Sequence, residues 1–335
     1  MAICALAALV MPYVPSIMDW SSQRVLLTGS AGFLGRAVAA ALRARGVPES
    51  SLRGLRSREY DLLRSERAAA ALTDFPGCTM VIHCAGLVGG LALNRAHPGR
   101  MFHDNMLMAL NIVEAARASG LADRGGKVVL IGSMTSYPAD APLPYHEDSL
   151  FRGLPDREIA AYGIAKLAAL QLLRAYHSEF GLRSACAVLV NLYGPGDNID
   201  DEKRAHAAGS LMKRFVDAAD RGLPEVVCWG TGTPSRDFLY IDDAAAGVLR
   251  VAEAVDDASA VNIASGRETT IKELTELIAR LSGFGGRIAW DAAKGDGVGR
   301  RCLDIGKARA LGWSPRTDLE TGLAATIEWY RSRRG

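Results

Sequence analysis

The stretch from Arg24 to Gly35 constrains the fold more than any other part of this sequence. It reads RVLLTGSAGFLG, an apolar run that ends in a glycine-rich turn, and residues rich in Ala, Leu and Val follow it. This order predicts a strand, a tight turn and the start of a helix. The first free N–H groups of such a helix and the positive end of its dipole attract phosphate.

The spacing of the glycines within this turn favours a dinucleotide as the ligand. Gly29 allows the tight turn, Gly32 lets the backbone approach a pyrophosphate, and Gly35 lets the helix pack on the strand. We therefore predict that a dinucleotide contacts the residues of the turn, namely Gly29, Ala31, Gly32, Phe33, Leu34 and Gly35. A turn of the same shape without a ligand is the alternative.

Composition excludes several other classes of protein. The chain has 335 residues, 49% of them hydrophobic, which suffices for one large domain or two that share a sheet. Its net charge of +2 gives no basic footprint for nucleic acid. The six cysteines are scattered without paired metal-ligand spacing, so we expect reduced thiols, no metal site and a cytoplasmic protein.

The first residues are apolar but are broken by Pro12 and Pro15, and no Lys or Arg precedes them. They lack the basic region of a signal peptide and are too short to span a membrane. We expect no membrane association and interpret residues 1–22 as an extension outside the folded part, with the native start at Met11 or Met18. A membrane anchor or a partner-binding segment is the alternative.

The second expected strand, 51–56, bears on the choice of cofactor. An NAD-preferring site usually carries an acidic residue at the end of this strand. Here Arg56 and Arg58 follow, together with Arg53 within the strand, and arginine suits a 2′-phosphate. We therefore favour NADP(H), while Glu59 leaves NAD(H) possible.

Other expected cofactor contacts follow the second and third strands. Asp61, followed by Leu62, could accept a hydrogen bond from an adenine amino group or could cap the next helix. Ala85 and Gly86 follow a continuous apolar strand at 79–83, and their small size would let a cofactor lie close to the backbone.

A serine, a tyrosine and a lysine point to proton and hydride chemistry. Ser133 comes after the apolar strand at 127–131, at the strand end where open α/β sheets bind ligands. Tyr162 and Lys166 lie four apart in a helix expected to run to Phe180, so they share one face. A neighbouring lysine should lower the pKa of the phenol and let it exchange a proton with a carbonyl or hydroxyl group.

With these residues in place, the chain resembles the extended short-chain dehydrogenases/reductases of the nucleotide-sugar epimerase and dehydratase class. Within that class it most resembles the GDP-L-fucose synthases. The resemblance covers about residues 23–331. It rests on these segments: Val88-Gly89-Gly90, NLYGPGDN at 191–198, WGTGTPSRDF at 229–238, SGFGGR at 282–287, Leu303-Asp304 and Leu311-Gly312-Trp313.

The resemblance implies a GDP-linked 4-keto-6-deoxy sugar as substrate, inversion at carbons 3 and 5, and reduction at carbon 4 by NADPH. It makes Ser133, Tyr162 and Lys166 the reduction triad. It also implies a homodimer, for which the expected helices at 98–119 and 160–180 are suitable. It assigns the substrate to these residues: Val88, Gly89, Asn191, Arg214, Trp229, Arg236 and Arg301.

Three positions depart from the family pattern. Ala31 stands where some members carry an Arg near the 2′-phosphate, and Arg301 stands where Lys is more common. The cysteine used for epimerisation is replaced by Thr135, whereas His206 matches the second epimerisation residue. A neutral Thr hydroxyl is a poor base, so proton removal beside the ketone should be slow or should use another group.

Several functional alternatives remain open at this point. His206, Tyr137 or an unplaced cysteine could replace the missing base. The chain could be a net reductase, or an epimerase that retains NAD and shows no net redox change. A non-catalytic dinucleotide-binding scaffold is the remote alternative.

These features predict an α/β fold, a Rossmann-type doubly wound parallel sheet with a smaller C-terminal α/β substrate region. We expect residues 23–190 to form mainly the NAD(P)-binding domain and residues 191–335 mainly the nucleotide-sugar-binding region. The two regions interleave, because residues 237–265 are expected to return partly to the first domain.

Overall fold

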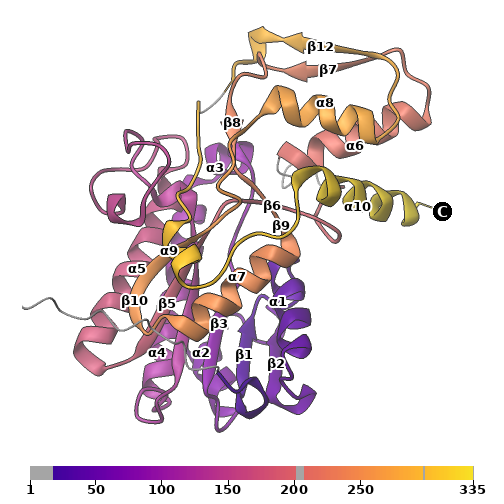
Figure 1. Cartoon of the computed structure of the whole chain (residues 1–335). Helices are drawn as coiled ribbons and strands as arrows, with labels where there is room; N and C mark the ends of the chain where they lie inside the picture. Colours follow the sequence, from indigo (N-terminus) through magenta and orange to yellow (C-terminus); the bar gives the residue numbers. More distant parts are fainter. Residues whose placement is uncertain (1–17, 201–206, 297–298, 335) are drawn as a thin grey trace, which may run out of the picture.

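A six-stranded parallel sheet lies at the centre of the computed structural model, which describes residues 18–200, 207–296 and 299–334 (Figure 1). The strand order is β2-β1-β3-β4-β5-β10, and every neighbouring pair is parallel. The strands are β1 (Val25–Thr28), β2 (Leu52–Leu55), β3 (Met80–His83), β4 (Lys127–Ser133), β5 (Arg183–Leu189) and β10 (Asp257–Ile263). The order reverses beside β1, so the predicted Rossmann-type fold class is confirmed.

Helices cover both faces of this sheet, which explains why its strands are apolar on both sides. Alternate residues of β1 show the two layers, because Leu27 packs with α1 and α7, whereas Leu26 packs with α2 and α4. The helices of these layers are α1 (Phe33–Ala44), α7 (Ile241–Ala254), α2 (Ser65–Thr73), α4 (Pro98–Ala118) and α5 (Ala160–Phe180). Two short helices, α3 (Leu91–Ala96) and α9 (Gly306–Ala310), lie in connecting segments.

The remaining elements form a smaller region with its own core beyond one end of the sheet (Figure 1). Three strand pairs belong to it: β6 (Asn191–Tyr193) with β9 (Phe238–Tyr240), β7 (Glu225–Trp229) with β12 (Arg287–Asp291), and β8 (Ser235–Arg236) with β11 (Thr269–Thr270). Its helices are α6 (Ala207–Asp220), α8 (Ile271–Leu281) and α10 (Leu319–Ser332). Their buried faces meet in a core that includes Phe215, Ile278 and Leu323.

Two local expectations need correction. Trp20 is buried in the core beside α1 and α7 and donates to a Glu253 carboxylate oxygen at 2.7 Å, so residues 18–22 of the expected extension are folded. Asp61 does not cap α2, which begins four residues later; its carboxylate accepts from the Leu63 N–H at 3.1 Å.

No helix in residues 18–200, 207–296 or 299–334 is long and apolar enough to cross a membrane. Helices α4 and α5 pack side by side on one face of the sheet. The homodimer expected through these helices stays a prediction.

The packing of α1 on β1 generates a first test. A Cβ atom added at Gly35 would lie 2.1 Å from the Gly29 carbonyl oxygen, so Gly35→Ala forces the backbone of the turn apart. We expect Gly35→Ala to lower the free energy of unfolding by about 1–3 kcal/mol and to weaken NADPH binding. Thermal unfolding and fluorescence titration with NADPH measure the two effects.

Gly99→Ala is the matched control, because Gly99 lies in helix α4 and a Cβ atom there would contact nothing within 4 Å. Alanine favours the helix over glycine, so this variant should be as stable as the wild type or slightly more so. Equal stability of the two variants would show that the turn is not sterically constrained.

Candidate active site

The glycine turn between β1 and α1 lies against the chain that follows β3. Gly29 adopts a φ of +66°, and a Cβ atom there would lie 2.7 Å from the Ala85 nitrogen. Gly32 is the N-cap of α1 and offers no side-chain cap, so the first N–H groups of the helix are open to an anion. The predicted contacts of the turn and the Ala85–Gly86 pair therefore lie at one place.

A buried polar chain holds the ends of β1 and β3 together. The Ala85 N–H donates to the Thr28 hydroxyl oxygen at 3.1 Å, and this hydroxyl lies 2.8 Å from Nδ1 of His83. Burial, with a smaller contribution from the Lys166 charge, lowers the pKa of His83 to about 3. His83 is therefore neutral near pH 7 and can accept the Thr28 proton at Nδ1.

Two asparagines of α4 fix loops on the cofactor side. Asn105 accepts from the Leu87 N–H at 3.1 Å and donates to the Leu87 carbonyl oxygen at 3.0 Å. Asn111 donates to the Leu62 carbonyl oxygen at 2.8 Å. The sequence shows both residues as polar positions in the helix, but it does not reveal which loops they hold.

The candidate catalytic residues come from the end of β4 and the first turns of α5. The Ser133 oxygen accepts from the Thr135 N–H at 3.2 Å and from the Thr135 hydroxyl at 2.8 Å. Tyr162 interacts with the Ser133 hydroxyl, and the Lys166 ammonium group lies 5.7 Å from the centroid of the Tyr162 ring. The fold thus brings the three triad residues and Thr135 together.

The expected direction of the Tyr162 pKa shift is wrong for this structure. Burial raises the pKa of the phenol to about 12, and the hydrogen bond with Ser133 opposes only part of that shift. Lys166 is itself desolvated, which lowers the pKa of its ammonium group. Near neutral pH the Tyr162 hydroxyl is therefore a proton donor.

Tyr137 and one of the cysteines do not fit the role of a replacement base. Tyr137 is buried and donates to Oδ1 of Asn262 at 2.6 Å, and burial further raises the pKa of its phenol. Cys84 has a thiol whose pKa is raised to about 12 by burial. His206, the third candidate, lies outside the described residues.

Two arginines of the expected substrate site lie close together in a desolvated place. Burial, and then the charge of Arg301, lower the pKa of Arg236 to about 10. Burial also lowers the pKa of Arg301, whose guanidinium group makes no hydrogen bond or ion pair with any other described residue. Tyr145 lies near both charges and stacks on Tyr137 at 5.0 Å between ring centroids, which connects the arginines to the Ser133 end of β4. Two buried like charges favour an anion such as a diphosphate.

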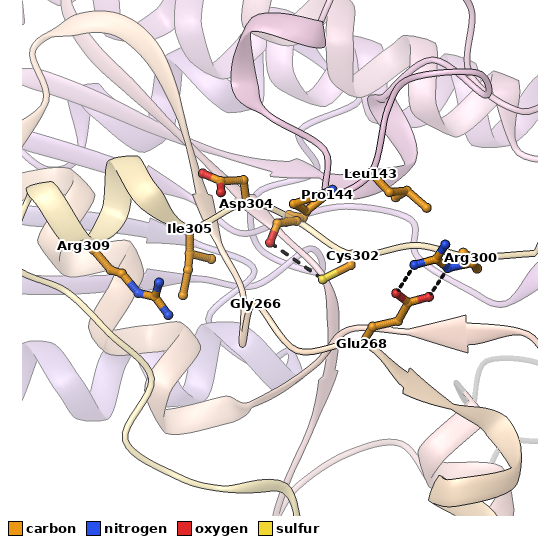
Figure 2. A pocket seen from close by; sticks show the side chains of 10 residues that line it. Leu143, Pro144, Gly266, Glu268, Arg300, Cys302, Asp304, Ile305 and Arg309 are labelled. Atoms are coloured by element: carbon orange, nitrogen blue, oxygen red, sulfur yellow. Dashed lines mark hydrogen bonds and ion pairs between the residues drawn. The ribbon is translucent and has the colours of Figure 1, made fainter.

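A cavity of about 300 Å³ lies between the loop at 143–144 and the chain that leads into α9 (Figure 2). Glu268 and Arg300 form a two-pronged ion pair at its wall, with N–O distances of 2.6 and 2.7 Å. Asp304 also lines this cavity.

A second cavity, of about 450 Å³, opens between α1 and β2. Ser30, Arg36, Gly54 and Arg56 are among its lining residues. The Arg36 guanidinium donates to the carbonyl oxygens of Ala31 and Gly196, so a positive charge stands at Ala31 although that residue has no side-chain charge. Sequence reasoning missed Arg36, whose position directly after Gly35 is the only local indication.

The three arginines considered for the 2′-phosphate separate in the structure. Arg56 lines this cavity, whereas the exposed Arg58 pairs with Glu59 at 3.7 Å. Arg53 donates to the Tyr60 hydroxyl and the Asp74 carbonyl oxygen, so it serves a local contact.

The remaining expected substrate residues lie on several elements. The Asn191 amide donates to the Asp237 carbonyl oxygen at 3.2 Å, and the Arg214 guanidinium donates to the Val227 carbonyl oxygen. Trp229, at the end of β7, is 70% exposed, so it is not a core residue. Val88 is exposed, and Gly89 packs against Leu93.

The comparisons with known proteins identify the family. The model of the "NAD dependent epimerase/dehydratase family" matches residues 25–264, and the chain belongs to that family of NAD(P)-dependent enzymes. GDP-L-fucose synthase of Escherichia coli (strain K12) is 34% identical over 92% of this chain and 97% of its own length.

Two solved structures share the fold. A GDP-6-OMe-4-keto-L-xylo-heptose reductase from C. jejuni has a TM-score of 0.85 at 24% identity, covering 93% of this chain and 98% of its own. A GDP-L-fucose synthetase from Naegleria fowleri bound to NADP has a TM-score of 0.81 at 24% identity, covering 93% of this chain and 95% of its own.

The hydrogen bonds that link Thr28 to His83 and Ala85 give a second test. Thr28→Val keeps the shape but leaves the buried His83 nitrogen without its partner, and it removes the acceptor of the Ala85 N–H. We expect a loss of about 1–3 kcal/mol in the free energy of unfolding and a higher KM for the cofactor. Denaturant titration and cofactor kinetics measure these effects.

Thr326→Val is the matched control for this substitution. Thr326 is equally buried, but its hydroxyl only donates to the Gly322 carbonyl oxygen one helical turn earlier. This variant should keep the wild-type KM. If both variants behaved alike, the polar chain would have no particular importance for the cofactor site.

Proposed function

We propose that this enzyme reduces carbon 4 of a GDP-linked 4-keto sugar with NADPH and does not invert carbons 3 and 5. The observation that carries the proposal is the hydrogen-bonding of Ser133. Its oxygen accepts two hydrogen bonds from Thr135, so its own proton is free to point at Tyr162 or a substrate oxygen.

The residues of the site suit the reductive direction. A bound reduced nicotinamide supplies the hydride. Tyr162 stays protonated near neutral pH, so it can donate a proton to the carbonyl oxygen as negative charge develops there. Ser133 can donate a second hydrogen bond to that oxygen, and the nearby Lys166 charge stabilises the phenolate that remains.

Thr135 separates this proposal from the full reaction of the GDP-L-fucose synthases. Proton removal beside a ketone needs a base, and the Thr135 hydroxyl is neutral and donates to Ser133. Neither Tyr137 nor Cys84 can act instead, because their pKa values are raised by burial. His206 lies outside the described residues, so the proposal of net reduction rests on Thr135.

The choice of a GDP-linked substrate has two supports. Arg236 and Arg301 form a desolvated pair of positive charges suited to a diphosphate. The similarity to the E. coli GDP-L-fucose synthase extends over both regions of the chain, which favours a GDP-linked sugar.

A third test follows the cofactor and the product together. The enzyme is mixed with NADPH and a GDP-linked 4-keto-6-deoxy sugar in deuterated water. We expect the near-ultraviolet absorbance of NADPH to fall in step with product, and the product to carry no deuterium on carbons 3 and 5 beyond an enzyme-free blank. Tyr162→Phe should lower kcat by about 10²–10⁴-fold, because the proton donor is lost.

Each alternative predicts a different result in this assay. Product formation at constant NADPH absorbance would identify a redox-neutral epimerase. Deuterium on carbon 3 or 5 in the wild-type product would overturn the role given to Thr135. Unchanged turnover of Tyr162→Phe would contradict the catalytic assignment.

A fourth test replaces Thr135, the residue that separates net reduction from inversion in this proposal. Thr135→Cys adds a thiol, with an ordinary pKa of about 8.5, where the family carries its epimerisation residue. We expect this variant to place deuterium on carbon 3 or 5, measured by mass spectrometry and proton NMR. Thr135→Val, which has neither a thiol nor a hydroxyl group, is the control and should show no deuterium uptake and a lower kcat. If it took up as much deuterium as Thr135→Cys, the thiol would not be the cause of the uptake.

A fifth test concerns the preference for NADPH over NADH. Arg56 and Arg36 line one cavity with Ser30, which suits a 2′-phosphate at the end of β2. We expect Arg56→Ala to raise KM for NADPH at least 10-fold and to leave KM for NADH nearly unchanged. Arg58→Ala, on the exposed residue paired with Glu59, is the control and should alter neither constant; equal effects of both variants would argue against a phosphate site at Arg56.

A further inference from the structure

A cluster of three metal-ligating side chains lies in the segments that follow Tyr145 and Leu303, and the proposed reaction does not use it. It consists of His146 and Glu147, from the loop after β4, and Asp304, from the chain that leads into α9. Backbone bonds hold the two segments together: the Tyr145 N–H donates to the Cys302 carbonyl oxygen at 2.8 Å, and the Asp304 N–H to that of Tyr145 at 2.9 Å. Asp304 lines the cavity shown in Figure 2.

Glu147 provides the observation that points to a ligand. Its side chain is only 6% exposed, and Oε1 accepts from the Asn262 N–H at 2.8 Å. Oε2 is buried and accepts no hydrogen bond from any described residue. A buried carboxylate oxygen without a donor is costly, and a cation would remove that cost.

The other two side chains lie where they could share such a cation. Nε2 of His146 is 3.9 Å from Oε2 of Glu147, and one ligand atom from each of the three residues falls within 4.8 Å of the others. Ligand atoms of a tetrahedral zinc ion lie about 3.4 Å apart, given zinc–ligand distances near 2.1 Å. The His146 ring is exposed, so it can rotate to bring Nε2 from 3.9 Å to about 3.4 Å from the Glu147 oxygen. Its exposure also leaves a route by which an ion can enter from solvent.

The surroundings of His146 decide which ring nitrogen carries the proton. Its Nδ1 accepts from the Asp148 N–H at 3.3 Å and lies 3.5 Å from a carboxylate oxygen of Asp148. In this structure the ring proton therefore belongs on Nε2, and a metal ion bound there would displace it.

We propose that His146, Glu147 and Asp304 bind a divalent transition-metal ion of the zinc type, with water as the fourth ligand. One imidazole and two carboxylates suit zinc better than magnesium or calcium, which prefer oxygen ligands only. The ion ties the loop after the catalytic strand β4 to the segment that carries Arg301. No short-spaced motif marks the site, because its ligands are 157 positions apart, from Glu147 to Asp304.

The test uses metal-free full-length protein with ZnCl₂ as the probe. Calorimetry should show binding of one zinc ion, and the thermal midpoint should rise by about 4 °C at roughly one hundred times the dissociation constant. MgCl₂ at the same concentration should produce neither effect. His146→Ala and Glu147→Gln should each weaken zinc binding at least 10-fold.

Asp140→Asn is the control, because it removes one negative charge from the same loop at an exposed position outside the cluster. It should bind zinc like the wild type. His146 is exposed, so His146→Ala should fold even if Glu147→Gln does not. Wild-type protein that binds no zinc, or a His146→Ala variant that binds it equally well, would overturn the proposal, and neither result depends on enzymatic activity.

Discussion

The cofactor site depends on the close approach of two backbones, the turn after β1 and the chain after β3. No side chain fits between Gly29 and Ala85, and the Thr28 hydroxyl bridges the two strand ends. This contact places the open N-terminus of α1 beside the Ala85–Gly86 pair. Lys166 then reaches the same place, because its Nζ lies 3.6 Å from where a Gly86 Cβ would be. One steric constraint thus places the expected phosphate site close to the helix that carries Tyr162 and Lys166.

On the expected substrate side the fold holds two positive charges away from water. Burial lowers the pKa of both guanidinium groups, and the charge of Arg301 also lowers that of Arg236. Arg236 donates to the Ser235 and Gly299 carbonyl oxygens at 2.7 Å, so its charge is already partly compensated within the fold. An anion that binds only the folded protein, such as a diphosphate, would stabilise it as it binds.

The sequence predicts the features that depend on residues close together in the chain. It does not predict properties that depend on contacts between residues far apart in the chain. Continuous apolar strands and the glycine turn are local, so the sheet and its first helix were predictable. The four-residue spacing of Tyr162 and Lys166 is also local, but the pKa of the phenol depends on burial and rises to about 12. Arg53 and Arg56 look equivalent in the sequence, yet only Arg56 lines the cavity beside the turn, because Tyr60 and Asp74 engage Arg53.

The return of the chain to the main sheet has a consequence for the active site. Strand β10 lies between two parts of the smaller region along the chain, and its Asn262 is fully buried. Its side chain accepts from the Tyr137 hydroxyl and donates to the carbonyl oxygens of Tyr145 and Asp304, while its N–H donates to Glu147. The loop after Ser133 is therefore anchored by a residue more than a hundred positions later. Because the same residue also holds the segment after Arg301, the catalytic end of β4 and the arginine pair are positioned by one strand. The interleaved chain order therefore helps to fix the loop after β4 and the segment after Arg301 relative to each other.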